Sequence, residues 1–158
     1  MLIDAGTRPR YARVRDDVVS DRARDADLGS SCSIAREMFA ADTASRALGI
    51  EIAELAPGRA TATMTVRESM VNGHGITHGG YVFALADTAF ALACNSRGSR
   101  AVAAHADIRF IASTELGDEL RAEAVERARF GRSGIYDVSV WQGETLVAEF
   151  RGHSRTIA

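Results

Sequence analysis

The order of apolar and polar positions along the chain predicts one buried helix. From Tyr81 to Cys94 the residues are apolar on every side of a helix, so a helix that begins near Gly79 should lie in the core. Asp87 is the only charged residue in this segment. The pattern therefore predicts a central helix that carries a single carboxylate.

Strand-like runs lie on both sides of this helix. Alternating residues at 50–55 and 60–66 are joined by a Pro57-Gly58 turn, which predicts a hairpin. Longer runs follow the helix and are separated by short breaks that contain glycine, as sheet turns do. They span about 100–111, 118–129, 134–141 and 144–156.

The N-terminal part divides into two predicted segments. Residues 1–30 hold six Arg and six Asp with few large apolar residues, and such a segment cannot bury enough surface to order itself. We interpret it as a flexible extension, and residues 31–158 as one domain. A helix from Ser33 to about Leu48, ended by Gly49, places Ile34 and Met38 on one face and is expected to cover the core.

One apolar helix and about six strands with short connections predict an α+β fold in which a curved antiparallel sheet wraps around a long central helix. A single sheet of this kind leaves its edges exposed, and pairing of two subunits edge to edge would hide them. The architecture alone therefore predicts at least a homodimer.

The composition and net charge of the chain limit the classes of molecule that it is expected to bind. The net charge is -2 and the pI is about 6.1, so no overall positive field recruits nucleic acid or anionic lipid. All 19 basic residues are arginines, which excludes Schiff-base lysine chemistry. The two cysteines do not suggest a disulfide framework, and a reducing cytoplasm is the expected location. The apolar run through Ala93 is too short to span a bilayer.

The loop before the predicted helix supplies candidate chemistry. Gly79 and Gly80 fall where the helix begins, and the first amides of a helix point outward with a partial positive charge suited to an oxyanion. The buried Asp87 either bonds neighbouring groups in a structural role or serves catalysis. Because Gly79 and Asp87 are about 12 Å apart along a helix axis, joint action on one substrate atom requires two subunits.

Other reactive residues have weaker patterns. His74 and His78 are four apart, but the surrounding glycines indicate a loop and no third ligand is evident, so no metal is expected. Cys94 within an apolar helix should have a raised pKa and pack in the core. The GRSG turn that begins at Gly131 does not fit the nucleophile elbow of serine hydrolases.

Several motifs carry a specific resemblance. NGHGITHGG, LADTAFALACNS, HADIRFIAS, GRSGIYDV and VAEFRGHSR together resemble the phenylacetate-degradation type of hotdog-fold acyl-CoA thioesterases, over roughly residues 33–157. The resemblance implies a hotdog fold and hydrolysis of an aryl-acetyl or hydroxyphenylacetyl thioester of coenzyme A. It also implies that coenzyme A is part of the substrate, that no cofactor is needed, and that two dimers form a homotetramer.

The same resemblance assigns residue roles. The Gly79 amide would polarise the thioester carbonyl, with Asn72 assisting or holding the loop and His78 ordering it. Asp87 of the opposing subunit would activate water or attack the carbonyl, so that the sites lie at the subunit interface. The remaining expected contacts are Thr88 or His105 for the water, and Arg129, Arg132, Ser133 and Gly134 for the phosphates of coenzyme A.

Two other functions stay open on the sequence. A hotdog dehydratase or hydratase would need a histidine placed to abstract an alpha proton, and His78 lacks the proline-rich loop of such enzymes. A non-catalytic acyl-CoA sensor would keep the arginine turn but would have no use for Asp87 on the helix. Hydrolysis uses both features, and we therefore place it first.

Overall fold

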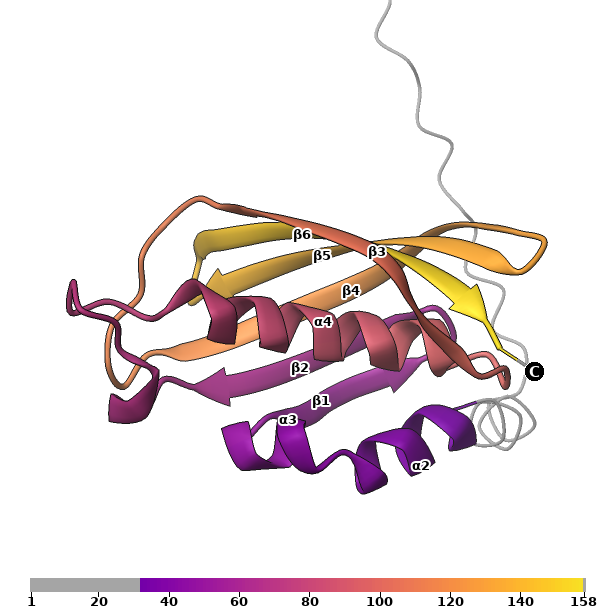
Figure 1. The fold of residues 1–158 in the computed structure, drawn as a ribbon, viewed down its shortest axis with the longest axis horizontal. Helices are drawn as coiled ribbons and strands as arrows, with labels where there is room; N and C mark the ends of the chain where they lie inside the picture. The colour runs from indigo at the N-terminus through magenta and orange to yellow at the C-terminus, as the bar shows by residue number, and fades with distance from the viewer. Residues whose placement is uncertain (1–31, 158) are drawn as a thin grey trace, which may run out of the picture.

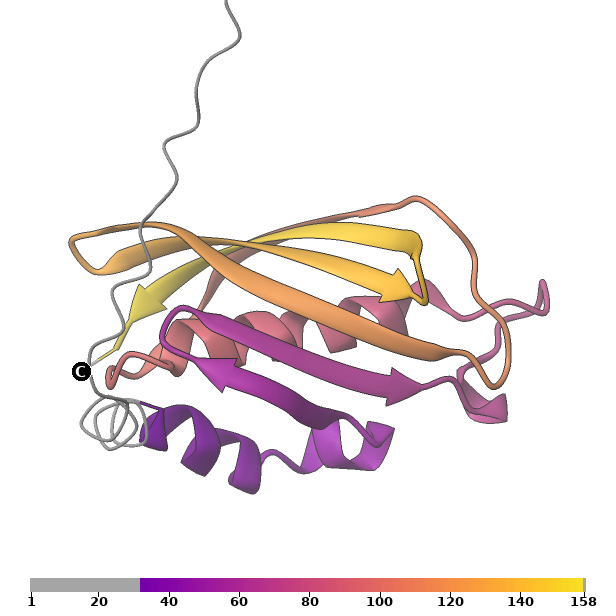
Figure 2. The same cartoon turned by 180° about the vertical axis from the view of Figure 1, so that it is seen from behind.

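A computed structural model describes residues 32–157, which form one curved antiparallel sheet with a long helix against one face (Figures 1 and 2). The strand order is β1-β2-β4-β5-β6-β3. This arrangement confirms the predicted α+β hotdog fold. The strands are β1 (Glu51–Ala56), β2 (Arg59–Thr65), β3 (Ala101–Phe110), β4 (Glu119–Phe130), β5 (Ser133–Gln142) and β6 (Thr145–Thr156); the helices are α2 (Ser33–Ala41), α3 (Thr43–Leu48), α4 (Gly79–Asn95) and the 3-10 turn η1 (Glu68–Met70).

Side chains of alternate residues on each central strand point toward α4. On β5 the even-numbered residues from Gly134 to Val140 are buried and the odd-numbered ones are half-buried, as a pleated strand with one covered face requires. Gly58 joins β1 to β2 at a φ of 75°, a conformation that favours glycine. The sheet thus presents an apolar concave face on which the helix packs.

Helix α4 fills that concave face. Leu85, Ala89 and Leu92 are fully buried in the core between helix and sheet. The ring of Phe90 lies against the backbone of Gly152 on β6, where a Cβ atom would come within 2.7 Å of the ring. This close approach fixes the helix over the sheet, and any side chain at position 152 would push the two apart.

The prediction that α4 is buried on every side is wrong for one stripe. Ala84, Asp87 and Ala91 are only half-buried and lie on one face, at spacings of three and four residues. Neither the sheet nor α2 covers this face completely. The only carboxylate of the helix therefore lies on its most accessible side.

The predicted covering helix is divided in two at Asp42. The Asp42 backbone is extended, and its carboxylate accepts a hydrogen bond from the Ser45 amide at 2.9 Å. This is an N-cap, which begins a new helix. Because the apolar positions of the two halves keep a helical spacing, the hydrophobic pattern alone did not reveal the break.

Strands β1 and β3 form the two edges of the sheet. Four of the ten residues of β3, from Val102 to His105, are exposed in succession, and Phe110 at its end is 56% exposed. An unpaired edge of this kind is available for pairing with another strand.

The prediction of a flexible extension at residues 1–30 lies outside the described residues. Between residues 32 and 157, no helix is both long and apolar enough to cross a membrane.

Candidate active site

The loop before α4 is organised by Asn72. Its side-chain oxygen accepts hydrogen bonds from the backbone amides of His74 (2.9 Å) and Ile76 (3.4 Å). The backbone amide of Asn72 donates to the Ile76 carbonyl at 2.8 Å. Gly75 closes the turn with a φ of 77°. The structure therefore gives Asn72 a loop-holding role at the start of the helix.

The first turn of α4 leaves one amide available. His78 is the N-cap residue, and its Nδ1 accepts a hydrogen bond from the Gly80 amide at 3.0 Å. Within the described part of the chain, the Gly79 amide donates to no acceptor. An unpaired amide at a helix N-terminus can donate a hydrogen bond to an oxygen that carries a partial negative charge.

This amide borders a cavity of about 430 Å³, within the size range of small-molecule pockets. A Cβ atom at Gly79 would lie 2.9 Å from the ring of Phe110, so a side chain at this position requires the exposed ring to shift. The half-exposed Phe110 ring thus lies directly over the start of the helix. The lining residues are Asn72, Ile76, Thr77, Gly79, Val82, Phe110, Ile111, Ala112, Ser113 and Thr114.

Asp87 lies two turns further along the helix. Burial raises the pKa of its carboxyl above the ordinary aspartate value, because the charged form loses solvation there. No donor among residues 32–157 bonds this carboxylate. The separation of about 12 Å along the axis keeps Asp87 out of the cavity at Gly79, so one chain does not unite the two groups.

The neighbouring Thr88 borders this stripe and is directed toward α3. Its hydroxyl donates to the Ala84 carbonyl at 2.9 Å and lies 2.9 Å from the Ser45 hydroxyl of α3. The side chain is buried. This placement ties α3 to α4, and the contact of Thr88 with water or substrate stays a prediction.

His105 is also directed elsewhere. It lies on β3 opposite His153 of β6, and the two rings meet edge to face with centroids 5.5 Å apart. The next register pair, Ala106 and Gly152, faces α4, so His105 belongs to the outer face of the sheet. It cannot orient a water for Asp87 of its own chain.

The thiol of Cys94 is buried and poorly suited to act as a nucleophile. Burial and the nearby Asp87 carboxylate raise its pKa to about 12, so the thiolate that a nucleophile requires is not formed at neutral pH. Neither His74 nor any other residue of 32–157 belongs to a group of three or more His, Cys, Asp and Glu side chains that could hold a metal ion.

The arginine turn between β4 and β5 lies at the other end of the molecule from Gly79 (Figure 1). Arg132 donates to the Thr156 carbonyl at 2.8 and 3.2 Å. At Gly134 a Cβ atom would lie 2.8 Å from both Ser154 and Tyr136. Ser133 and the exposed Arg129 pair with neighbouring strands in the register. Much of this turn therefore has a structural use within one chain.

Comparisons with known proteins place the chain in a family. Residues 74–149 match the model of the thioesterase superfamily. The acyl-coenzyme A thioesterase PaaI of Escherichia coli is 45% identical over 124 residues, which are 78% of this chain and 89% of that protein. The chain belongs to the PaaI-type thioesterases. Members of this group are thioester hydrolases.

Solved structures agree with this membership. The E. coli PaaI structure has a TM-score of 0.80 and 42% identity, and the match covers 83% of this chain and 96% of that one. A Streptococcus mutans protein bound to acetyl CoA has a TM-score of 0.67 and 25% identity, over 69% of this chain and 89% of its own. The PaaI-type fold thus accounts for nearly all of the sheet and helix described above.

Sequence patterns did not reveal part of the cavity at Gly79. The hydroxyl of Thr114 donates to that of Thr77 at 2.7 Å, and the Thr77 amide donates to the Thr114 carbonyl at 2.8 Å. These bonds hold the segment after β3 against the loop before α4. The two residues are 37 positions apart, and no spacing rule links them.

Proposed function

We propose that this PaaI-type thioesterase hydrolyses acyl-CoA thioesters of the aryl-acetyl class, including hydroxyphenylacetyl-CoA. The substrate follows from the E. coli relative, which is named an acyl-coenzyme A thioesterase and comes from the phenylacetic acid degradation operon. The relative bound to acetyl CoA supports the coenzyme A portion. Coenzyme A enters as part of the substrate, and no further cofactor is needed.

The observation that carries the proposal is the unpaired Gly79 amide beside a cavity. In the reaction, the thioester carbonyl oxygen accepts a hydrogen bond from this amide, which stabilises the negative charge that develops on the oxygen. A donor of this kind typically contributes about 2.7–4 kcal/mol to the transition state. Asn72 and His78 hold the amide in position through the loop and the N-cap.

Asp87 of a second subunit supplies the base. Its carboxylate takes a proton from water as the water oxygen bonds to the carbonyl carbon. The tetrahedral intermediate then collapses, the carbon–sulfur bond breaks, and coenzyme A leaves as a thiolate that gains the proton. Direct attack by the Asp87 carboxylate would give an anhydride that water then opens, with the same products. Burial raises the pKa of Asp87 above the ordinary aspartate value, which makes its carboxylate a stronger base.

A site that is shared between two subunits requires the protein to form at least a dimer. We propose a homodimer paired along the β3 edge and, by analogy with the family, a cytoplasmic homotetramer. The exposed β3 edge supports this pairing. Arg129 and Arg132 of the turn would then lie toward the phosphates of coenzyme A bound at a neighbouring subunit.

Thiol release from a panel of CoA esters tests the function. The panel contains phenylacetyl, hydroxyphenylacetyl, benzoyl and straight-chain esters, and compares the wild type with Asp87→Asn. Preference for the aryl-acetyl esters, with a loss of about 10²-fold or more in the variant, is the expected result. Coenzyme A binding without turnover of any ester would instead indicate a sensor, and alpha-proton exchange without hydrolysis would indicate a dehydratase or hydratase.

A further inference from the structure

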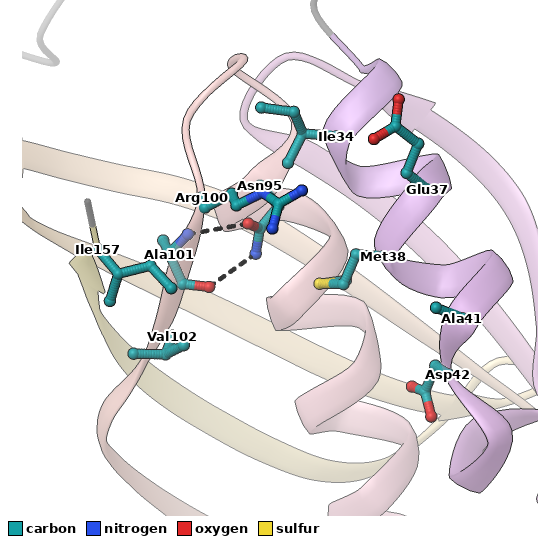
Figure 3. A pocket seen from close by; sticks show the side chains of 10 residues that line it. All are labelled: Ile34, Glu37, Met38, Ala41, Asp42, Asn95, Arg100, Ala101, Val102 and Ile157. Atoms are coloured by element: carbon teal, nitrogen blue, oxygen red, sulfur yellow. Dashed lines mark hydrogen bonds between the residues drawn. The ribbon is translucent and has the colours of Figure 1, made fainter.

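A second cavity lies at the opposite end of α4 from Gly79. It encloses about 390 Å³ between α2, the end of α4 and the start of β3. Figure 3 shows Ile34 and Met38 facing it from α2, with Val102 and Ile157 on the other side. The lining residues are Ile34, Glu37, Met38, Ala41, Asp42, Asn95, Arg100, Ala101, Val102 and Ile157.

The walls of this cavity are mainly apolar and come from separate elements. Met38 and Ile34 are half-buried, whereas Val102 and Ile157 remain 48% and 44% exposed. Asn95 forms a rigid floor, because its side chain bonds both backbone groups of Ala101 at 2.9 and 3.0 Å. An apolar ligand entering here would remove these four side chains from water, which is favourable in proportion to the area covered.

The half-buried stripe of α4 runs from Asp87 to Ala91, and the buried Asn95 one turn further lines the cavity. Ala91 follows Asp87 by one turn on the same face, and Asn95 follows Ala91 by another. No bulky side chain of the helix lies on this line. A ligand whose reacting carbonyl is at Asp87 could therefore extend along the helix and reach the cavity after about 12 Å.

We propose that this cavity receives the far end of the acyl group, so that the enzyme also accepts acyl groups that extend beyond a phenylacetyl unit. The inference rests on the proposed function and adds longer acyl groups to the substrates proposed there. The cavity belongs to the subunit that supplies Asp87. Met38 limits its depth, because its side chain points into the space from α2 (Figure 3).

Charge around the cavity restricts the end of the acyl group. Glu37 and Asp42 line it on the side of α2 and Arg100 on the side of β3. Two carboxylates against one guanidinium disfavour an anionic end. The structure fits an apolar end or one with a neutral hydroxyl, which can accept a hydrogen bond from Arg100.

A cavity-filling variant tests this inference. In Met38→Trp, kcat/KM for decanoyl-CoA should fall by 10-fold or more, the scale on which lost apolar contacts discriminate between substrates. The values for acetyl-CoA and phenylacetyl-CoA should stay within about 2-fold. Arg36→Trp is the matched control, because Arg36 lies on the same helix, is exposed and does not line the cavity. Met38→Phe is a milder filler if Met38→Trp fails to fold.

Two results would overturn the inference while leaving the hydrolase function intact. One is an equal loss on all three esters, and the other is an unchanged rate on decanoyl-CoA. Failure of the wild type on every ester would refute the hydrolase function itself. In that case the affinities of the wild type and of Met38→Trp for the ethyl-CoA and decyl-CoA thioethers test whether the cavity holds the acyl end. If it does, filling the cavity must weaken the binding of the decyl compound only.

Discussion

The two ends of helix α4 are built for different purposes. At the C-terminal end, Asn95 bonds both the amide and the carbonyl of Ala101, and Ser96 donates to Ala93 and accepts from the Gly58 amide at 2.7 Å. All of these groups have hydrogen-bond partners, and the side chains of Asn95 and Ser96 are buried. At the N-terminal end, the Gly79 amide stays unpaired beside a cavity.

The polar side chains at the C-terminal end of α4 stabilise the fold, whereas those at the N-terminal end leave the Gly79 amide available to a substrate. An unsatisfied buried polar group costs about 1–3 kcal/mol, and the chain avoids this cost at Asn95. At Gly79 the available amide borders open space, where substrate can supply the missing acceptor. Asn72 and Asn95 are the same residue type at the two ends, and they serve as natural controls for each other.

The largest effect is expected from removing the amide at the N-terminal end. Gly79→Pro deletes this donor, while proline is well tolerated at the first position of a helix. We expect kcat to fall by about 10²–10³-fold, as for the loss of one oxyanion donor. The measurement is steady-state hydrolysis of phenylacetyl-CoA.

Gly79→Ala controls for the added Cβ atom. Both variants place a carbon against the Phe110 ring, but only alanine keeps the amide. The alanine variant should therefore retain most of the activity that proline loses. Equal losses would mean that crowding against Phe110, and not the missing donor, causes the defect.

At the C-terminal end we expect a loss of stability instead. Asn95→Ala leaves the amide and carbonyl of Ala101 and the Ala91 carbonyl without their partner. The free energy of unfolding should fall by about 2–3 kcal/mol, measured by urea denaturation. The folded fraction should hydrolyse short acyl esters at a wild-type rate. A large kcat defect with unchanged stability would contradict the division between the two ends.

Asn72→Ala should lower kcat and leave the stability nearly unchanged, which is the reverse of the result expected for Asn95→Ala. Its effect on kcat should be smaller than that of Gly79→Pro. The lost bonds lie in a loop that is largely exposed, so stability should change by about 1 kcal/mol or less. A loosened loop misplaces the Gly79 amide, and we expect kcat to fall by about 10-fold. Kinetics and denaturation of the same preparation distinguish this outcome from a purely structural one.

The smallest effect concerns the contribution of Asp87 to stability, which is separate from its large expected effect on activity. Burial raises its pKa in the folded state, so ionisation disfavours folding as the pH rises through that value. Asp87→Asn should raise the melting temperature at pH 8, because the neutral amide avoids the cost of burying a charge. The gain should disappear at low pH, where the wild-type carboxyl is protonated.

The same pKa governs the rate. Activity needs the carboxylate, so kcat/KM of the wild type should decline as the pH falls through the raised pKa of Asp87. The acidic limb should therefore lie above the ordinary aspartate range. A limb at or below that range would contradict a buried general base.

Sequence patterns predicted the elements better than their boundaries and exposure. The period-2 alternation of the strands and the apolar run of α4 determine the element types, because burial imposes these periods. The break at Asp42 was missed, since a side-chain cap leaves the apolar spacing unchanged. The half-buried stripe at Asp87 was missed for a related reason. Which side of an apolar helix remains uncovered depends on how the sheet and α2 pack around it.

The candidate site could be predicted only where it depends on local structure. The positions of Gly79 and His78 at the helix start follow from glycines and polar residues close in the sequence. The contact between Phe110 and Gly79 and the contact between the hydroxyls of Thr88 and Ser45 join segments that are distant in the sequence. Such contacts depend on strand order and register, which the hydrophobic pattern does not specify.

In the proposed mechanism, Gly79 and Asp87 act together across a subunit interface. Co-expression of the Gly79→Pro and Asp87→Asn chains tests it directly, because each chain alone is inactive. A mixed dimer has one site with both defects and one site with none. If the site is shared, activity should return to about a quarter of the wild-type value, since half of the dimers are mixed. If mixed dimers form and remain inactive, the site lies within one chain and the claim is wrong.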